Sequence, residues 1–549
     1  MTELIIGRRL RELPFAATPI GAEVYGEKFG ESVRLKVGDP GGLTTLGPDG
    51  KVPVEQVPDT VTPLREDLAS ADPEKGSAMV GFQQAGEGAV PRTVEEKLRD
   101  TISVKDFGAV GDGVADDTSA FQAAVNAVSG DDIIIPGGTY KITAPVVVTG
   151  VERVNLVGAG SDFTKLQAVG NFESILVFDG TSFRNYARNM KLDVGATTTI
   201  GVKLGGLGNK VVDCEMIGSN DSGSAPLAFI DSSYNRFEKC RFSPLHANLW
   251  SAWLDNRADG GLVISNFFLS CQFSNAGKGV WIKKSHAGKP RTEGSLFEGT
   301  FFINTGANQL LVDSHYGLQV VASSFEECGG TAVDLDGIDR VQIVGSTVGL
   351  AAGVVGNPCL RLRATMGKGT IISGNQFRGG DFAIQADATA SAHIHGLTIS
   401  NNVFDTHGLA SLTLDSVTGC SVMGNVELSG SGYARGSWNT FATHADKGSY
   451  HFHGNTWSAP GAAFFDPASK YYASQEVNGP SLVNSGKQVV AAAATSVTIS
   501  HGLRVAPGEV QVTPEGNVGN FYILNIDATS FSIAWANSTT CSWHWKAKV

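Results

Sequence analysis

Two short phrases near the middle of the chain present ionisable side chains in the same order. Residues 284–288 read KSHAG and residues 313–317 read DSHYG, 29 positions later. If the chain coils with a similar period, the two phrases stack and bring Asp313 beside Lys284. The neighbouring coils then place Asp255 and Asp336 at the same position. The predicted column consists of Asp255, Lys284, Asp313 and Asp336, with Arg257, His286 and His315 alongside, and His315 next to His286.

Paired carboxyl groups at this spacing indicate glycoside hydrolysis, which needs one protonated acid and one ionised partner. Inverting enzymes hold the two groups roughly 6.5–9.5 Å apart, and retaining enzymes about 5–5.5 Å apart. Coils stack about 4.8 Å apart, so Asp255 and Asp313 approach the first spacing, and Asp313 and Asp336 the second. Neighbouring carboxylates also raise the pKa of one of them. We predict an inverting endo-hydrolase with Asp313 and Asp255 as the pair and Asp336 as modulator; if the register is shifted, Glu298 and Glu326 are substitutes.

Aromatic side chains lie in the two longest coils. Trp250, Trp253 and Trp281 could stack on sugar rings, although core packing is the alternative for each of them. The column itself could be a solvated charged strand with no catalytic role. A second chemistry is β-elimination on a uronic acid, for which a base and a cation would come from Arg257, Lys284, His286, His315 and Tyr316. A third interpretation is an adhesin that binds through the same groove without cleavage.

A repeated strand motif between residues 154 and 457 must position these side chains. A Cys, Ser, Thr or Asn precedes an aromatic or aliphatic residue about eleven times, at intervals in the twenties, which is typical of a solenoid. The sequence lacks a leucine-rich register and any long window of helical periodicity. Three short strands and three turns fit each coil, which predicts an all-β, right-handed parallel β-helix with side-chain ladders inside. The ladder positions are Cys214, Cys240, Cys271, Thr300, Ser324, Ser346, Asn375, Asn402 and Asn425, with weaker copies at Asn189 and Asn455.

Composition limits the classes of partner. The net charge of −12 argues against nucleic acid and anionic membranes. The seven cysteines fall singly and lack a Cys-x-x-Cys spacing, and Cys214, Cys240 and Cys271, which share one repeat position, are predicted to form an inward thiol ladder rather than disulfides. The residues Asp106, Asp112, Asp116 and Asp117 lack the spacing of a calcium loop. We therefore predict no metal and no cofactor. The sequence contains neither a signal-peptide pattern nor an apolar run of membrane-spanning length, so we expect folding in a reducing cytoplasm.

The segments flanking the coil differ in character. Residues 1–60 are strands and turns with little apolar content and are expected to lean on a partner, and residues 61–100 are a polar neck. The coil is expected over residues 101–460, opened by an amphipathic helix near residues 116–128 that Asp116 or Asp117 caps. Residues 461–486 are a linker, and the β-rich residues 487–549 are expected to support trimerisation or to bind carbohydrate.

The opening of the coil resembles a known family. Residues 104–113 (VKDFGAVGDG), then Asp116-Asp117-Thr118, then residues 136–140 (PGGTY), resemble the pectate-lyase-like β-helix of bacteriophage tailspikes. Residues 80–86 and 93–98 look like the neck of the same proteins, and residues 47–53 are similar to tail-fibre linkers. The resemblance implies a homotrimeric virion protein that attaches to the tail or baseplate through its N-terminus. It also implies binding, and usually cleavage, of capsular polysaccharide or O-antigen outside the cell. The opening motif is architectural and implies no catalytic residue.

Overall fold

The computed structural model divides the chain into two compact units, residues 1–101 and residues 102–549. Among the residues that the structure describes, no helix combines the length and the apolar character that crossing a bilayer requires. These residues are 23–28, 31–36, 61–197, 199–220, 225–256, 262–283, 290–303, 306, 308–363, 368–387, 394–415, 417–428, 440–442, 450–455, 483–490, 495–501, 506–515, 518–527, 529–536 and 541–548.

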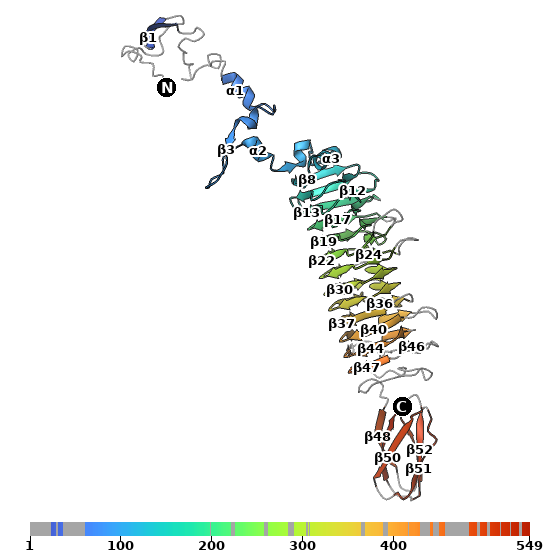
Figure 1. The fold of residues 1–549 in the computed structure, drawn as a ribbon. Helices are drawn as coiled ribbons and strands as arrows, with labels where there is room; N and C mark the ends of the chain where they lie inside the picture. The colour runs from blue at the N-terminus through green and yellow to red at the C-terminus, as the bar shows by residue number, and fades with distance from the viewer. Residues whose placement is uncertain are drawn as a thin grey trace. The chain divides into compact units, whose positions relative to one another are not determined.

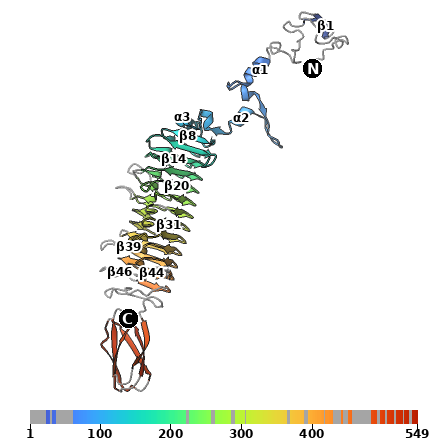
Figure 2. The same cartoon turned by 180° about the vertical axis from the view of Figure 1, so that it is seen from behind.

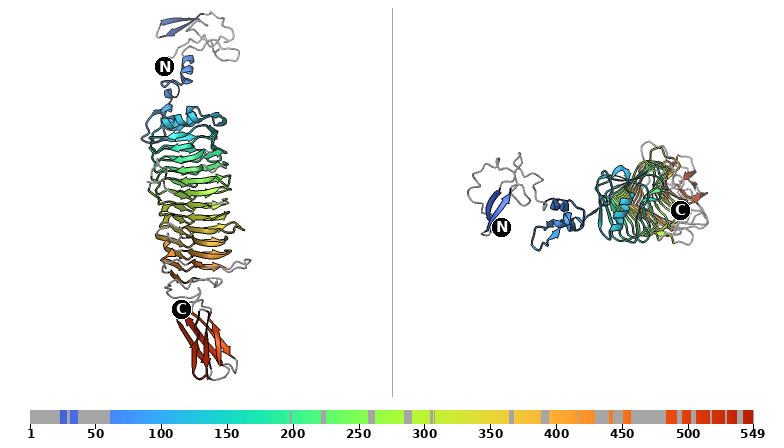
Figure 3. Two further views of the ribbon diagram at one scale, coloured as in Figure 1. Left: turned by 90° about the vertical axis from the view of Figure 1, so that its right-hand side faces the viewer. Right: turned by 90° about the horizontal axis from the view of Figure 1, so that it is seen from above.

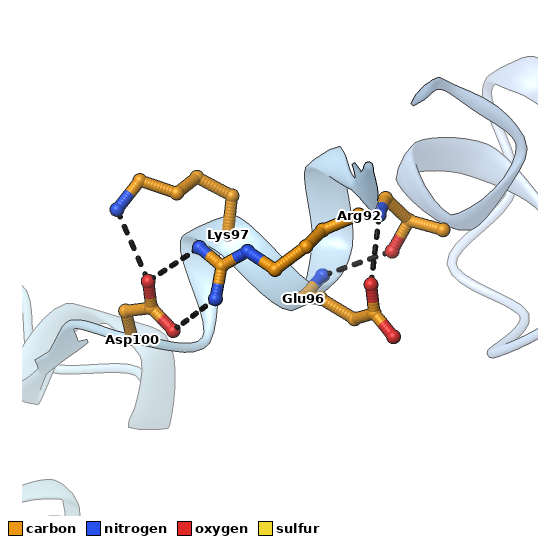
Figure 4. A network of polar contacts seen from close by, with 5 residues as sticks. Arg92, Glu96, Lys97 and Asp100 are labelled. Carbon is orange, nitrogen blue, oxygen red and sulfur yellow. Dashed lines mark hydrogen bonds and ion pairs between the residues drawn. The ribbon is translucent and has the colours of Figure 1, made fainter. Parts of the chain in front are cut away.

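The first unit contains short elements held by local polar contacts. Thr93 caps the last helix, because its hydroxyl accepts from the Glu96 N–H while the Glu96 carboxylate accepts from the Thr93 N–H. Asp100 then accepts from Arg92 at 2.6 Å and from Lys97 at 3.0 Å (Figure 4). The elements are β1 (Glu23–Lys28), β2 (Glu31–Lys36), α1 (Val61–Leu68), η4 (Gly76–Met79), β3 (Gly81–Phe82), β4 (Arg92–Thr93) and α2 (Val94–Leu98).

The second unit begins with a solenoid in which each coil adds one strand to each of three parallel sheets (Figures 1 and 2). The first sheet runs from β5 (Ile102–Ser103) to β47 (Tyr450–His453), and the second from β6 (Asp112–Asp116) to β45 (Val426–Leu428). The third runs from β9 (Val146–Val148) to β46 (Thr440–Ala442). Strands of successive coils therefore lie directly above one another (Figure 3). The predicted right-handed parallel β-helix is confirmed.

The predicted ladder fills the corner between the first and second sheets. Cys214, Cys240 and Cys271 are buried free thiols. In the last coils the ladder consists of asparagines, and the Oδ1 atom of Asn402 accepts from the Asn375 N–H at 2.9 Å. Two predicted ladder positions were wrong by one residue. Ser323 rather than Ser324 accepts from the Thr300 N–H, and Met190 rather than Asn189 occupies the ladder position. Side-chain amides and hydroxyls thus pair backbone groups that the turn leaves open.

Helix α3 (Thr118–Ala127) covers the first coil with the predicted apolar face of Phe121, Ala124 and Val125. Of the two predicted capping residues, Asp117 stands at the N-cap position, but its carboxylate makes no capping hydrogen bond. The carboxylate of Asp116 accepts from the Thr118 N–H at 3.1 Å, whereas that of Asp117 accepts from Val110 and Gly111. Asp117 therefore ties the opening loop to the helix, which is the architectural role expected for this motif.

The C-terminal strands form two antiparallel three-stranded sheets with an apolar core of their own, which includes Phe531, Ile533 and the fully buried Trp543. One sheet consists of β48 (Val483–Val490), β53 (Cys541–Lys548) and β50 (Glu509–Glu515). The other consists of β49 (Ser496–Ser500), β52 (Ser530–Trp535) and β51 (Phe521–Leu524). Whether they support trimerisation or carbohydrate binding stays a prediction.

Candidate functional site

The predicted aspartates follow neighbouring strands of the third sheet. The strand before each aspartate ends in a fully buried residue, Leu254, Val312 or Leu335, and the next residue leaves the core. The backbone pairs Asp313 with Ile282 at 2.9 Å and Asp336 with Val312 at 2.7 Å. The strands are β21 (Trp250–Leu254), β24 (Lys278–Ile282), β28 (Leu310–Val312), β32 (Val333–Leu335) and β36 (Pro358–Arg363). Asp255, Lys283, Asp313, Asp336 and Arg363 thus form one line, the aspartate column.

The three acids follow one another in the predicted order, but the lysine between the first two is a different residue from the one predicted. Lys283 stands between Asp255 and Asp313, because its N–H pairs with the carbonyl of Leu254. The prediction of Lys284 at this position was therefore wrong by one residue. Lys284 lies outside the described residues, as do Arg257 and His286.

Lys283 and Asp255 form a shielded ion pair. The Nζ atom of Lys283 lies 3.3 Å from Oδ2 of Asp255, whose side chain is only 10% exposed. The same ammonium lies 3.3 Å from the ring centroid of Trp253 and 4.6 Å from that of Trp281. Because its charge is neutralised at short range and water has little access, Asp255 is poorly placed to activate a water molecule.

Asp313 has a different environment. Its Oδ2 atom accepts a hydrogen bond of 2.7 Å from Nε1 of Trp281. Burial raises the pKa of Asp313, and the negative charge of Asp336 raises it further, while the Trp281 hydrogen bond and the positive charge of Arg363 lower it. The net pKa is raised. Asp313 therefore lies in an environment that favours its protonated form.

The sequence reasoning missed a carboxylate beside the column. Asp334, only 2% exposed, precedes Asp336 by two residues and accepts two hydrogen bonds from Arg363, one of them from Nε at 2.8 Å. Side chains alternate along a strand, so Leu335 points into the core while Asp334 and Asp336 both point outward. This alternation in the sequence could have indicated Asp334. The bidentate pair anchors Arg363 next to Asp313 and Asp336.

Two predicted sugar platforms are largely inaccessible. Trp250 and Trp253 are 4% and 7% exposed, and they pack with Phe229 and Ile200 in an apolar cluster separate from the main core. The prediction that they present ring faces to a sugar was wrong, since indoles this deeply packed have no free face. Trp281, which is partly exposed, remains a candidate contact.

His315 is also a structural residue. It is fully buried, with Nδ1 at 2.7 Å from the Thr292 hydroxyl and Nε2 accepting from the Ser295 N–H at 3.2 Å. Burial lowers its pKa to about 3. Its register partner on the preceding coil is Thr292, and its complete burial contradicts the predicted substrate contact; the predicted neighbour His286 lies outside the described residues.

The remaining predicted residues lie on other elements. Tyr316 in β29 (His315–Tyr316) has the guanidinium of Arg340 5.0 Å from its ring centroid. Glu298 belongs to β26 (Leu296–Glu298) of the first sheet, and Glu326 to β31 (Ser324–Cys328) of the second. The two substitute acids therefore do not share a sheet with the aspartate column.

Glu326 nevertheless lines a groove of about 750 Å³ beside the second sheet. Gly349 pairs with Arg378 in the register of this sheet, and a Cβ atom added to it would meet only ordinary contacts, the nearest at 3.7 Å. The groove also contains Asp381 and Asp405. Such a polar hollow is suited to binding a sugar chain.

Comparison with known proteins agrees with the resemblance found in the sequence. Residues 101–224 match the family model described as rhamnogalacturonase A/epimerase, pectate lyase-like. The tail spike protein of Shigella phage Sf6 is 32% identical over 141 residues, which are 24% of this chain and 22% of that protein. Mannuronan C5-epimerase AlgE2 of Azotobacter vinelandii is 38% identical over 79 residues, 13% of this chain and 8% of that protein. The chain thus spans less than a quarter of the length of either relative.

Among solved structures, a mutant tailspike protein of E. coli bacteriophage HK620 superposes with a TM-score of 0.53 at 14% identity. The match covers 89% of this chain and all of that chain. At this identity the likeness concerns the fold. Together with the sequence match to a tail spike protein, it confirms the predicted resemblance to phage tailspikes.

Proposed function

We propose that the chain is the spike of a phage tail, which binds a bacterial capsular polysaccharide or O-antigen and cleaves it by endo-glycosidic hydrolysis at the aspartate column. The observation that carries this proposal is Asp313, a partly buried carboxyl group with a raised pKa next to a second carboxylate. Attachment to the tail or baseplate through the N-terminus and association into a homotrimer belong to the same proposal. The sequence match to a tail spike protein supports it.

In this mechanism Asp313 donates its proton to the glycosidic oxygen. Asp336 is favoured as the ionised partner over Asp255, because Asp255 is engaged by Lys283. Adjacent coils are about 4.8 Å apart, which is nearer to the spacing of about 5–5.5 Å in retaining enzymes than to that of inverting ones. Cleavage with retention of the anomeric configuration is therefore expected with Asp336, and inversion with Asp255.

The test is depolymerisation of a panel of capsular polysaccharides, followed by reducing-end release. Asp313→Asn and Asp336→Asn should each reduce the rate by about 10²–10⁴-fold, the usual contribution of acid–base groups. Glu298→Gln is the matched control on another sheet and should retain full activity. Loss of activity in Glu326→Gln with full activity in Asp313→Asn would move the site to the second-sheet groove. The anomer of the first product distinguishes retention from inversion.

A lyase is the second candidate, because Lys283 and Arg363 flank Asp313 and could neutralise the carboxylate of a uronic acid. Its product would carry a new double bond and absorb ultraviolet light, unlike a hydrolysis product. An adhesin would bind the polysaccharide and release no reducing ends. The trimer is tested by the light-scattering mass of the full chain, expected to be three times 57.5 kDa.

A further inference from the structure

A hollow of about 500 Å³ lies on the first sheet near the beginning of the solenoid, beside the strand marked β13 in Figure 1. It is formed by residues of β10 (Asn155–Gly158) and β13 (Tyr186–Arg188), by the turns that precede them and by Gly130 before β7 (Asp132–Ile135). We name it the arginine pocket; its lining residues are Gly130, Arg153, Asn155, Arg184, Tyr186 and Arg188.

Arg153 and Arg184 occupy the same corner of two successive coils. Their backbones pair in the same way, Arg153 with Phe183 at 3.2 Å and Arg184 with Leu207 at 3.0 Å. Both side chains are exposed, and within the described part of the chain neither guanidinium takes part in an ion pair, hydrogen bond or ring contact. With coils about 4.8 Å apart, two such groups can bind one anion between them.

The wall of the pocket is held in place by a third arginine. Asp132 accepts from Nη2 of Arg188 at 3.0 Å and from Nδ2 of Asn155 at 2.6 Å. This fixes both side chains, yet Nε of Arg188 and Oδ1 of Asn155 are buried and have no hydrogen-bond partner among the described residues. A donor and an acceptor are therefore left for a polar ligand, since buried polar atoms are normally paired.

An aromatic ring lines the same pocket, and a further cation lies over that ring. Tyr186 pairs with Asn155 and Lys210 across the sheet, and the Lys210 ammonium lies 5.0 Å from its ring centroid. The carboxylate of Asp132 is already bound to Arg188, and the exposed Glu152 is not among the lining residues. In a chain of net charge −12, this local excess of cations is selective for anions.

We propose that the arginine pocket binds an anionic sugar unit of the polysaccharide, with its carboxylate or ester phosphate between Arg153 and Arg184 and its ring against Tyr186. The proposal rests on the proposed function, because it names the class of polysaccharide that the spike recognises. Guanidinium groups suit this task, since their planar fork binds two oxygens of one anion at once.

The backbone conformation at the two arginines allows both to be replaced by glycine without strain. Arg153 and Arg184 have φ angles of +60° and +55°, in the left-handed region that favours glycine, and Gly208 occupies the same corner on the next coil. Arg153→Gly/Arg184→Gly therefore removes two charges without weakening the fold. Arg340→Gly is the matched control, since Arg340 has a φ of +53° at the same corner. It stands six coils beyond Arg184, about 29 Å away.

The test is calorimetric titration of the full chain with three probes: oligogalacturonate, inorganic phosphate and neutral maltohexaose. Oligogalacturonate or phosphate should bind, the stronger of the two identifying the anion, and maltohexaose should not. The double glycine variant should bind the anionic probe at least tenfold more weakly, whereas Arg340→Gly should match wild type. Circular dichroism and thermal unfolding should show the double variant as stable as wild type.

Three outcomes would overturn the proposal: equal binding by wild type and the double variant, binding no stronger for anionic than for neutral probes, or equal loss in Arg340→Gly. A change of oligomeric mass in the double variant would assign the arginines to contacts with a second copy and would also overturn it. Failure of the proposed function looks different. In that case Asp313→Asn leaves any cleavage unchanged, or no cleavage occurs, while probe binding still depends on Arg153 and Arg184.

Discussion

Replacing Trp281 by phenylalanine should extend activity to higher pH. The indole Nε1–H donates to Oδ2 of Asp313 at 2.7 Å, and this bond stabilises the ionised carboxylate and lowers its pKa. Phenylalanine keeps an aromatic ring in the cluster with Trp250 and Trp253 but has no donor. If Asp313 acts as general acid, it must be protonated. Loss of the bond therefore raises the pKa of Asp313 and moves the basic limb of the pH–rate profile upward.

The size of this shift follows from the bond and its exposure. A hydrogen bond to a charged group contributes about 1.5–3 kcal/mol. Asp313 is only partly buried, so water replaces part of the lost interaction, and about 1 kcal/mol is expected to remain. Because one pH unit corresponds to about 1.4 kcal/mol, the basic limb should move by somewhat less than one unit.

The assay is the initial rate of reducing-end release at low substrate concentration across pH, so that it reports kcat/KM. Trp253→Phe is the matched control, since its Nε1 atom is buried and has no hydrogen-bond partner among the described residues. It changes the same aromatic cluster without touching the donor to Asp313. An unmoved or lowered basic limb in Trp281→Phe, or an equal shift in Trp253→Phe, would refute the assignment of Asp313 as the acid.

Three further predictions concern the solenoid itself. Burial lowers the pKa of His315 from 6.5 to about 3, so the unfolded chain binds more protons than the folded chain between these pH values. The stability that neutral His315 contributes is therefore lost as pH falls from 6.5 towards 3. The thermal midpoint of His315→Gln should depend less on pH in this range than that of wild type. Asn402→Ala removes the acceptor of two buried N–H groups of Asn375 and the donor to two buried oxygens, and should cost about 3 kcal/mol or more in thermal unfolding. Serine, which occupies the ladder two coils earlier, should cost less. Burial raises the pKa of Cys214 to about 12 and that of Cys240 as well, so a thiol reagent should label no cysteine in the native protein and all seven after denaturation.

The ladder explains how much of the fold could be predicted. Cys214, Cys240 and Cys271 sit at a corner where every coil must satisfy its backbone from inside, so their spacing reports the coil length at that corner. It does not report the length of the turns at the other two corners. For this reason the order of Asp255, Asp313 and Asp336 was predictable, while the lysine between the first two was misplaced by one residue.

The accessibility of the site could not be predicted for a different reason. Alternation along β21 places Trp253 on the outer face, but the sequence does not say whether an outer face is covered. Phe229, its register partner, is fully buried although it also points away from the main core. In an earlier coil, the side chain of Asn266 accepts from the Asn235 N–H just before a first-sheet strand, and His315 accepts from the Ser295 N–H in the same way. A lone histidine carries no such periodic signal.

The stacking that creates the fold also decides which acid can keep a proton. Carboxylates at one position of successive coils stand about 4.8 Å apart, where repulsion must be relieved by a cation or by protonation. Asp255 is relieved by Lys283 and Asp334 by Arg363. Asp313 instead receives the uncharged N–H of Trp281 while facing the negative charges of Asp336 and Asp334. Burial and these two negative charges together outweigh the Trp281 hydrogen bond and the positive charge of Arg363, so the environment of Asp313 favours its protonated form.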